Sequence, residues 1–339
     1  MRAVEEIKPA DPGRDRHDGG RPPEHLQEPA SRPARSLLVA ASALLVGLWI
    51  GVGVHGLVSY GHAYIKYRGF SPPKDARGVP VGRTITVHFY STSLRQRRLY
   101  EVYLPPGYAR LAARGARFPV VYLLHGSPGG PSLFSDAANM GVDEDRLLAD
   151  HSIRPFLAVM PNGRDKSFIS DTEWADTPHG RYEGFVLDVV RDVDARFPTI
   201  PRRRWRAIAG LSEGAYGSMN VALRNLRTFG IAESWSGYFR QLRTGPFRHA
   251  SPAVVAANSP AGYVGSMGPE LKRWPLHAFI YMGRRDPTEP GVYAFAVRLR
   301  AAGAFVKFSF VRGGHDWSLW RRMMPTSLEY TSRTFGAGA

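Results

Sequence analysis

The sequence predicts a large α/β domain with a mostly parallel, doubly wound sheet, preceded by one N-terminal transmembrane helix. Two observations predict the domain: short, continuous apolar runs recur along the chain, and stretches with helical periodicity separate them. Continuous apolar runs are typical of strands covered on both faces, and alternation of strands with helices is typical of a parallel sheet. A third observation predicts the membrane helix, because the segment Leu37–Tyr60 is almost wholly apolar.

Composition divides the chain into four segments. Residues 1–35 are rich in Pro, Gly and charged residues, and a segment that can bury so little apolar surface is predicted to be a disordered tail. Residues 36–60 are predicted to be a transmembrane signal-anchor, because a helix of this length reaches across a bilayer. The Pro and Gly content of residues 61–81 predicts a linker, and residues 82–339 form the α/β domain.

A cleaved signal peptide is the main alternative for the apolar segment. The apolar run is longer than the core of a signal peptide and the stretch before it is long, which favours an uncleaved anchor. Basic residues are balanced around the helix, so positive charge barely decides its orientation. They are Arg16, Arg21, Arg32 and Arg35 before it, and Lys66, Arg68, Lys74 and Arg77 after it. We expect a single-pass protein of the cell membrane with the large domain on the outer side.

Cysteine content and charge exclude several classes of protein. The chain of 339 residues contains no cysteine, which excludes disulfides, thiolate metal sites and a cysteine nucleophile. The formal net charge of +16 is compatible with anionic lipid, with an acidic cell envelope, or with a compositional bias toward arginine. Aromatic residues do not alternate with arginine as they do in nucleic-acid-binding modules, so no nucleic-acid partner is expected.

The strands are expected where their patterns occur along the chain. Thr84–Tyr90 and Arg98–Leu104 alternate between apolar and polar residues, which predicts an antiparallel pair at one edge of the sheet. The buried parallel strands are expected at the continuous runs Pro119–Leu124, Phe156–Met160, Trp205–Ala209, Ala278–Met282 and Val306–Val311. The clearest helices between them are Gly184–Phe197 and Ala215–Leu226.

The stretch Gly210-Leu211-Ser212-Glu213-Gly214 carries the strongest chemical signal. It has the pattern G-x-S-x-G, follows an apolar run and precedes a helical one. A nucleophile elbow requires this strand–turn–helix context, since the sharp turn lifts the serine hydroxyl clear of the sheet. Ser212 is therefore predicted to be a nucleophile, and a purely structural turn is the alternative.

A serine nucleophile of this kind needs an acid and a base that follow it along the chain. His315 is the candidate base, because it follows the last predicted strand in a loop loosened by two glycines. Asp286 is the candidate acid, because it follows the preceding strand and a carboxylate there would fix the tautomer of the imidazole. Glu289 is the rival acid, and a helix cap is the alternative role for Asp286.

Two backbone N–H groups are expected to bind the oxyanion that forms during acyl transfer. One belongs to Glu213, the residue after the nucleophile. The other is assigned to Ser127, in the loop His125–Gly130 that follows the first buried strand. His125 itself is expected to be structural.

Four blocks, in their order and spacing, resemble a known family of esterases: LLHGSPGG, MPNG, GLSEGAYGSMNVAL and GGHDW. The family includes esterase D, feruloyl esterases and the mycolyltransferases of the antigen 85 group, and the resemblance covers residues 82–335. It implies the α/β-hydrolase fold, a triad of Ser212, Asp286 and His315, and carboxylic-ester chemistry without a metal or another cofactor. The segments Asp171–Trp174 and Tyr182–Phe185 also resemble the family near its active site, as scaffold or pocket wall.

Glu213 departs from the family pattern, which often has Met, Gln or His after the serine. Its amide can still bind an oxyanion. Its carboxylate is expected to add negative charge near His315, which would favour the imidazolium and disfavour anionic acyl chains. Residues Ser234–Trp274, which show little periodicity, are expected to supply much of the acyl pocket.

These residues predict a membrane-anchored serine esterase that forms an acyl-enzyme on Ser212. The expected partners are a membrane and a small-molecule, lipid or glycan ester. An acyltransferase that moves the acyl group to a sugar or lipid hydroxyl uses the same triad and is the first alternative. The second alternative is a catalytically inactive binding module with a hydrolase fold.

Overall fold

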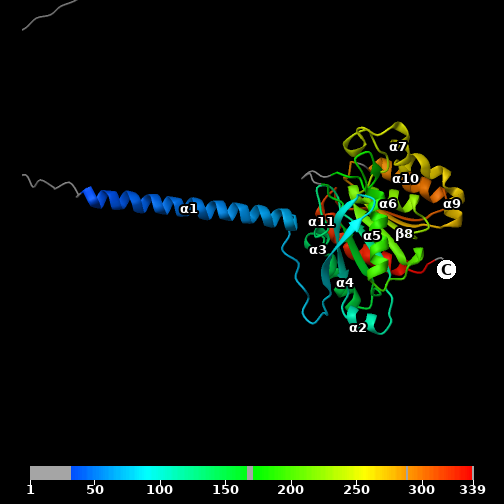
Figure 1. The fold of residues 1–339 in the computed structure, drawn as a ribbon, viewed down its shortest axis with the longest axis horizontal. Helices are drawn as coiled ribbons and strands as arrows, with labels where there is room; N and C mark the ends of the chain where they lie inside the picture. Colours follow the sequence, from blue (N-terminus) through cyan, green and yellow to red (C-terminus); the bar gives the residue numbers. More distant parts are fainter. Residues whose placement is uncertain (1–31, 166–170, 288, 338–339) are drawn as a thin grey trace, which may run out of the picture. The chain divides into compact units, whose positions relative to one another are not determined.

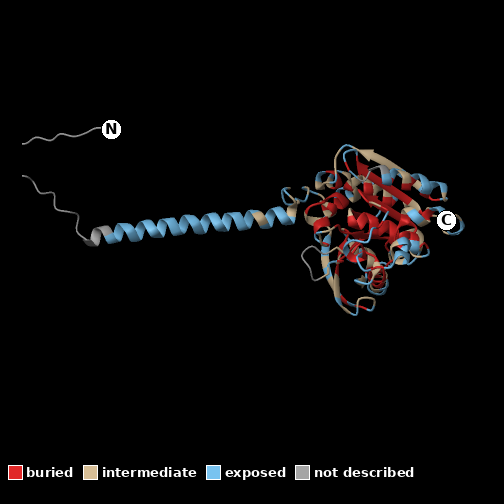
Figure 2. Cartoon of the chain, turned by 90° about the horizontal axis from the view of Figure 1, so that it is seen from above, coloured by how far each residue is buried: buried red, intermediate tan, exposed pale blue. Residues whose placement is uncertain are grey.

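The computed structural model describes residues 32–165, 171–287 and 289–337 (Figure 1). The chain divides into two units, residues 1–60 and 61–339. The described part of the first unit belongs to helix α1, Arg32–Tyr67. Its side chains from residue 36 to residue 60 are all exposed, as the pale blue helix in Figure 2 shows. The span Ser36–Tyr67 is long and apolar enough to cross a membrane.

Helix α1 is longer at both ends than the predicted membrane segment 36–60. It runs from Arg32 to Tyr67, so the first residues of the predicted linker 61–81 are helical. Residues 61–67 contain no proline, and the helix ends where Arg68 and Gly69 adopt left-handed backbone angles, with φ of 54° and 85°. The predicted disordered tail, residues 1–35, lies outside the described residues up to residue 31.

The second unit is built around an eight-stranded sheet with the order β1-β2-β4-β3-β7-β8-β9-β10. β1 pairs antiparallel with β2, β2 pairs antiparallel with β4, and the other neighbours are parallel. The strands are β1 (Arg83–Ser91), β2 (Gln96–Leu104), β3 (Val120–Leu124), β4 (Leu157–Pro161), β7 (Arg206–Leu211), β8 (Ile231–Trp235), β9 (His277–Gly283) and β10 (Phe305–Val311), with a separate ribbon of β5 (Asp176–Thr177) and β6 (Gly180–Arg181). The predicted mostly parallel sheet with an antiparallel edge pair is confirmed.

Helices cover both faces of this sheet. Along β3, Val120, Tyr122 and Leu124 pack into one core with α5 and α6, whereas Val121 and Leu123 pack into a second core with α4 and α11. A strand buried on both faces needs apolar residues at every position, which explains its continuous apolar run. The helices of this unit are α2 (Tyr108–Ala113), α3 (Leu133–Asp136), α4 (Met140–Ala149), α5 (Tyr182–Arg196), α6 (Glu213–Arg224), α7 (Pro252–Ala257), α8 (Pro260–Tyr263), α9 (Gly268–Arg273), α10 (Glu289–Ala301) and α11 (Trp317–Thr334), with short 3₁₀ turns at Arg203–Trp205, Gly245–Phe247 and Val264–Ser266.

Two strands differ from the sequence-based expectation. The pattern does not predict β8, because Glu233 and Ser234 interrupt its apolar run although both are fully buried. Glu233 is tolerated there because Trp235 Nε1 and the hydroxyl groups of Ser327 and Thr331 donate to its carboxyl group. β10 is only partly buried, rather than covered on both faces, since it forms an edge of the sheet.

Candidate active site

Ser212 occupies the turn between β7 and α6, near the middle of the sheet. Its backbone angles, φ 55° and ψ −119°, lie where residues other than glycine are rarely found, as a nucleophile elbow requires. Gly210 and Gly214 permit this turn. A Cβ atom on Gly210 would lie 2.3 Å from the Gly214 carbonyl oxygen, and one on Gly214 would lie 2.0 Å from the Leu124 carbonyl oxygen. Ser212 is only partly buried, so its hydroxyl is open to a substrate.

A chain of hydrogen bonds joins three of the predicted residues. His315 Nε2 lies 2.8 Å from Ser212 Oγ, and His315 Nδ1 lies 2.9 Å from Asp286 Oδ2. In the neutral imidazole that fits this chain, Nδ1–H donates to the carboxylate and Nε2 accepts from the serine hydroxyl. The arrangement can move the serine proton to the imidazole, while the carboxylate stabilises the imidazolium that results.

The topology of the sheet explains why these three residues meet. Ser212 follows β7, Asp286 follows β9 and His315 follows β10, and the carboxyl ends of parallel strands lie at one edge of a sheet. The Asp286 side chain is fully buried, whereas the His315 side chain is 34% exposed. The His315 ring packs edge-on against Trp320, with 5.2 Å between ring centroids, and the Asp316 side chain caps α11. These contacts orient the loop that carries the imidazole.

The two predicted oxyanion donors belong to segments that adjoin Ser212. Glu213 is the first residue of α6, and the first N–H groups of a helix have no acceptor within the helix. Ser127 lies in the loop after β3, the strand next to β7. The approach of this loop to the serine is close, since a Cβ atom on Gly126 would lie 3.1 Å from Ser212 Cβ. The assignment of the two amides to an oxyanion stays a prediction.

His125 braces this loop and takes no part in the hydrogen-bonded chain. Its ring is buried, Nε2 accepts from the Gly163 N–H at 3.1 Å, and Nδ1 lies 3.0 Å from the Gly126 carbonyl oxygen. Because Nε2 is an acceptor, the proton sits on Nδ1. Burial lowers the pKa of His125 to about 4, which keeps the ring neutral near pH 7.

The carboxyl group of Glu213, which is predicted to add negative charge near His315, is bound by the segment Thr172–Glu173. The Glu213 side chain is buried, and Oε1 accepts from the backbone N–H groups of Thr172 and Glu173 at 3.0 and 2.7 Å. Burial, together with the carboxyl groups of Glu173 and Asp171, raises the pKa of Glu213 well above its ordinary value. These surroundings disfavour the charged form of the group, so they do not support the predicted effect on the imidazolium.

The segment Asp171–Trp174 forms scaffold beneath the serine. Trp174 is fully buried and its Nε1 donates to the His125 carbonyl oxygen at 3.0 Å. The Tyr238 hydroxyl lies 2.6 Å from both carboxyl oxygens of Glu173. The segment therefore links the nucleophile elbow to the loop that carries Ser127.

Sequence reasoning missed one group of residues beside the site. Lys66 and Arg68 fall in the predicted linker, yet both contact the α/β unit next to the loop that carries Ser127. The sequence around a basic residue in a Pro- and Gly-rich stretch does not show whether its side chain lines a site or is exposed to solvent in a linker.

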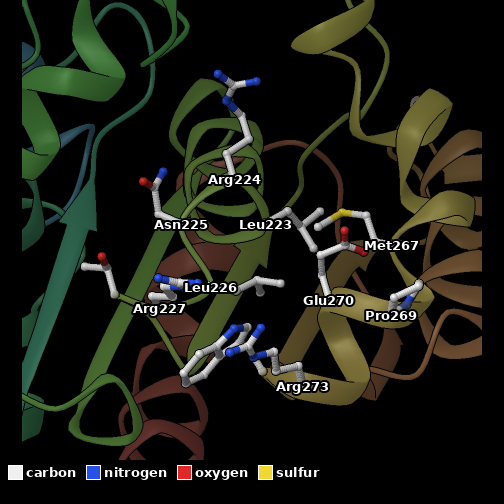
Figure 3. A pocket seen from close by; sticks show the side chains of 11 residues that line it. Leu223, Arg224, Asn225, Leu226, Arg227, Met267, Pro269, Glu270 and Arg273 are labelled. Atoms are coloured by element: carbon white, nitrogen blue, oxygen red, sulfur yellow. The ribbon is translucent and has the colours of Figure 1, made fainter.

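Outside this site, a hollow lies at the opposite end of α6 (Figure 3). It has a volume of about 460 Å³, and its lining includes Arg224 and Arg227 near the end of α6 and Arg273 and Trp274 near the end of α9. The two ends of α6 are about 17 Å apart at ~1.5 Å per residue, so this hollow is separate from Ser212. In the part of the chain that the structure describes, no group of three or more His, Asp or Glu side chains could hold a metal ion.

Comparisons with known proteins identify the family. The family model described as "Putative esterase" matches residues 91–270, more than half of the chain. The chain belongs to this esterase family. An endo-1,4-beta-xylanase/feruloyl esterase of Xylanibacter ruminicola is 27% identical over 247 residues, which are 72% of this chain and 30% of that protein. An esterase of Mycobacterium tuberculosis is 29% identical over 137 residues, which are 40% of this chain and 28% of that protein. The chain thus spans less than a third of the length of these two curated relatives.

Solved structures agree with the esterase family. A ferulic acid esterase superposes with a TM-score of 0.68 at 25% identity, covering 76% of this chain and 100% of that one. The fluorophosphonate-binding serine hydrolase F of Staphylococcus aureus superposes with a TM-score of 0.62 at 20% identity, covering 74% of this chain and 99% of that one. The expected α/β-hydrolase fold and the family resemblance are both confirmed.

Proposed function

We propose that the protein is a membrane-attached serine esterase that cleaves carboxylic esters through an acyl-enzyme on Ser212. The observation that carries the proposal is the hydrogen-bonded chain from Ser212 through His315 to Asp286. Membership of the esterase family supports carboxylic-ester hydrolysis as the reaction.

The mechanism follows from the order of the hydrogen bonds. His315 Nε2 takes the proton of Ser212 as Oγ attacks the ester carbonyl, and Asp286 stabilises the imidazolium. The amides of Glu213 and Ser127 bind the oxyanion. The imidazolium then protonates the leaving alcohol, which departs and leaves the acyl group on Ser212. Water is the proposed acceptor because the His315 side chain is 34% exposed, so solvent can reach the base that activates it.

Covalent labelling tests the nucleophile. The wild-type full chain in detergent should react with a fluorophosphonate probe and hydrolyse 4-nitrophenyl butyrate, and Ser212→Ala should lose both. Ser318→Ala is a matched control, because Ser318 is an exposed serine close to His315. Labelling that persists in Ser212→Ala would overturn the assignment, and an inactive binding module would show neither labelling nor turnover in the wild type.

The attachment to a membrane rests on α1. We propose that it is an uncleaved anchor in the cell membrane, with the catalytic unit on the outer side, since its residues 36–60 are largely apolar and all exposed. Membrane fractions should retain the protein at high salt and alkaline pH, and protease added to intact cells should digest the catalytic unit. Release at high salt, or full protection from protease, would contradict the anchor or its orientation.

A further inference from the structure

Residues 61–70, which we call the arm, pack against the α/β unit beside the active site. Arg68 Nη2 donates to the Pro128 carbonyl oxygen at 3.0 Å, and its guanidinium lies 5.7 Å from the centre of the Trp317 ring. The guanidinium of Arg321 lies 4.7 Å from the centre of the Phe70 ring. The arm therefore contacts both the loop that carries Ser127 and the start of α11, directly after His315.

The backbone of the arm turns where these contacts occur. The Arg68 N–H donates to the Tyr64 carbonyl oxygen at 2.7 Å, the Phe70 N–H donates to the Tyr67 carbonyl oxygen at 3.0 Å, and Arg68 has a φ of 54°. A left-handed conformation is unfavourable for arginine and persists only where surrounding contacts hold it. The contacts of the Arg68 side chain with Pro128 and Trp317 lie at this turn.

A hollow of about 470 Å³ lies between the arm and the α/β unit. Three cations line it, Lys66, Arg68 and Arg164, against one carboxylate, Asp136, whose Oδ1 lies 3.8 Å from Lys66 Nζ. Arg68 Nε is buried and has no hydrogen-bond acceptor among the described residues. Among the described residues, the hydrogen bonds of Arg164 use its backbone and leave its guanidinium without an acceptor. The hollow therefore holds more positive than negative charge and offers unused donors.

One loop borders both the hollow and the nucleophile. Pro128, Gly129 and Gly130 line it, and Gly126 in the same loop lies against Ser212. Two residues of extended chain span at most about 7 Å. A substrate of ordinary size with its ester carbonyl at Ser212 can therefore place another group in the hollow.

The geometry points to a substrate subsite in this hollow, formed jointly by the arm and the α/β unit, that binds the carboxylate or phosphate of an anionic ester. Guanidinium groups match these anions because their N–H donors form paired hydrogen bonds with two oxygens. Ile65 and Leu133 also line the hollow and would contact an apolar part of the same substrate. The inference rests on the proposed esterase function and adds the class of ester that the enzyme prefers.

Matched ester pairs test the subsite with the full chain in detergent. One pair is mono(4-nitrophenyl) succinate and its methyl ester, with the charge on the acyl side. The other is 4-carboxyphenyl butyrate and its methyl ester, with the charge on the alcohol side. Wild type should prefer the anionic member of at least one pair. In Arg164→Gln, kcat/KM for that member should fall about tenfold, the size of one lost charge-assisted contact, with the neutral ester nearly unchanged.

Arg227→Gln is the matched control, because Arg227 is an exposed cation in the other basic hollow (Figure 3). It should leave the preference for the anionic ester unchanged. Lys66→Gln, on the arm, should lower that preference by a smaller factor, since Asp136 already neutralises part of its charge. Equal losses for charged and neutral esters in Arg164→Gln, or no preference in wild type, would overturn the subsite.

A binding readout separates this inference from the proposed function. Calorimetry should detect binding of succinate or inorganic phosphate to the full-length Ser212→Ala chain, and Arg164→Gln in that background should weaken it about tenfold. If wild type hydrolyses no ester and takes no fluorophosphonate, the proposed function fails and this measurement decides the subsite alone. Binding that is absent, or that does not respond to Arg164→Gln, overturns the subsite.

Discussion

Two buried carboxyl groups near Ser212 have different partners. Asp286 is distant along the chain, yet its carboxylate lies 2.9 Å from His315 Nδ1. Glu213 is the next residue after the serine, yet its carboxyl group faces the amides of Thr172 and Glu173. The order of strands in the sheet, rather than proximity in sequence, therefore decides which carboxyl group contacts the base His315. The Asp286 carboxyl group is placed to act on the imidazole, and the Glu213 carboxyl group connects the nucleophile elbow to the segment Thr172–Glu173.

Asp286→Asn, which changes the carboxylate that contacts His315, should lower activity more than any other substitution considered. An amide in place of the carboxylate cannot stabilise the imidazolium and favours the wrong tautomer, so kcat for 4-nitrophenyl butyrate should fall by about 10³-fold or more. Binding of substrate should change little. A loss smaller than about tenfold would move the acid role to the rival Glu289, whose side chain lies outside the described residues.

Glu213→Ala, which removes the carboxyl group that contacts Thr172 and Glu173, should destabilise the fold. Removal of the carboxyl group leaves the buried N–H groups of Thr172 and Glu173 without their acceptor, so the free energy of unfolding should fall by about 2–4 kcal/mol. Denaturant unfolding of the full chain in detergent would measure it. Glu213→Gln keeps an acceptor oxygen and serves as the control. An unchanged midpoint in Glu213→Ala would show that the contacts of Glu213 with this segment do not support the fold.

Glu173→Gln should change how the stability of the protein depends on pH. Burial and the charge of Asp171 raise the pKa of Glu173 to about 8. Between its ordinary pKa of 4.5 and about 8, the unfolded chain loses a proton that the folded chain keeps, so the free energy of unfolding falls as pH rises through this window. The variant has no proton to lose at this position and should show a shallower decline. Equal slopes for wild type and variant would contradict the raised pKa.

Glu213→Gln should have the smallest effect. Because the carboxyl group of Glu213 is bound to the amides of Thr172 and Glu173 and burial disfavours its charged form, its replacement should leave the pH dependence of kcat/KM unmoved and kcat within about threefold. A shift of the lower limb of the pH–rate profile would restore the interpretation that Glu213 carries negative charge to the imidazole.

Much of the fold could be predicted, because the parallel strands are buried on both faces and are therefore written as continuous apolar runs. β8 escaped prediction because Glu233 is stabilised by hydroxyl groups on α11, far along the chain. The length of α1 was underestimated because apolar composition ends before helical geometry does. The contacts of the arm with Pro128 and Trp317 could not be predicted either. They depend on a single arginine that contacts a distant loop, and such a contact leaves no periodic pattern in the sequence.

The elbow at Ser212, the order of nucleophile, acid and base, and the apolar helix before the domain can all be recognised without a structure. Each of these is local: close-packed glycines, an apolar run and chain order need no partner to be recognised. The contacts of the Glu213 side chain, and the position of residues 61–70 beside the site, are visible only in the folded protein. Those features result from burial and hydrogen bonding between segments that are distant along the chain. The free energy of such contacts depends on spatial neighbours, which the local sequence does not specify.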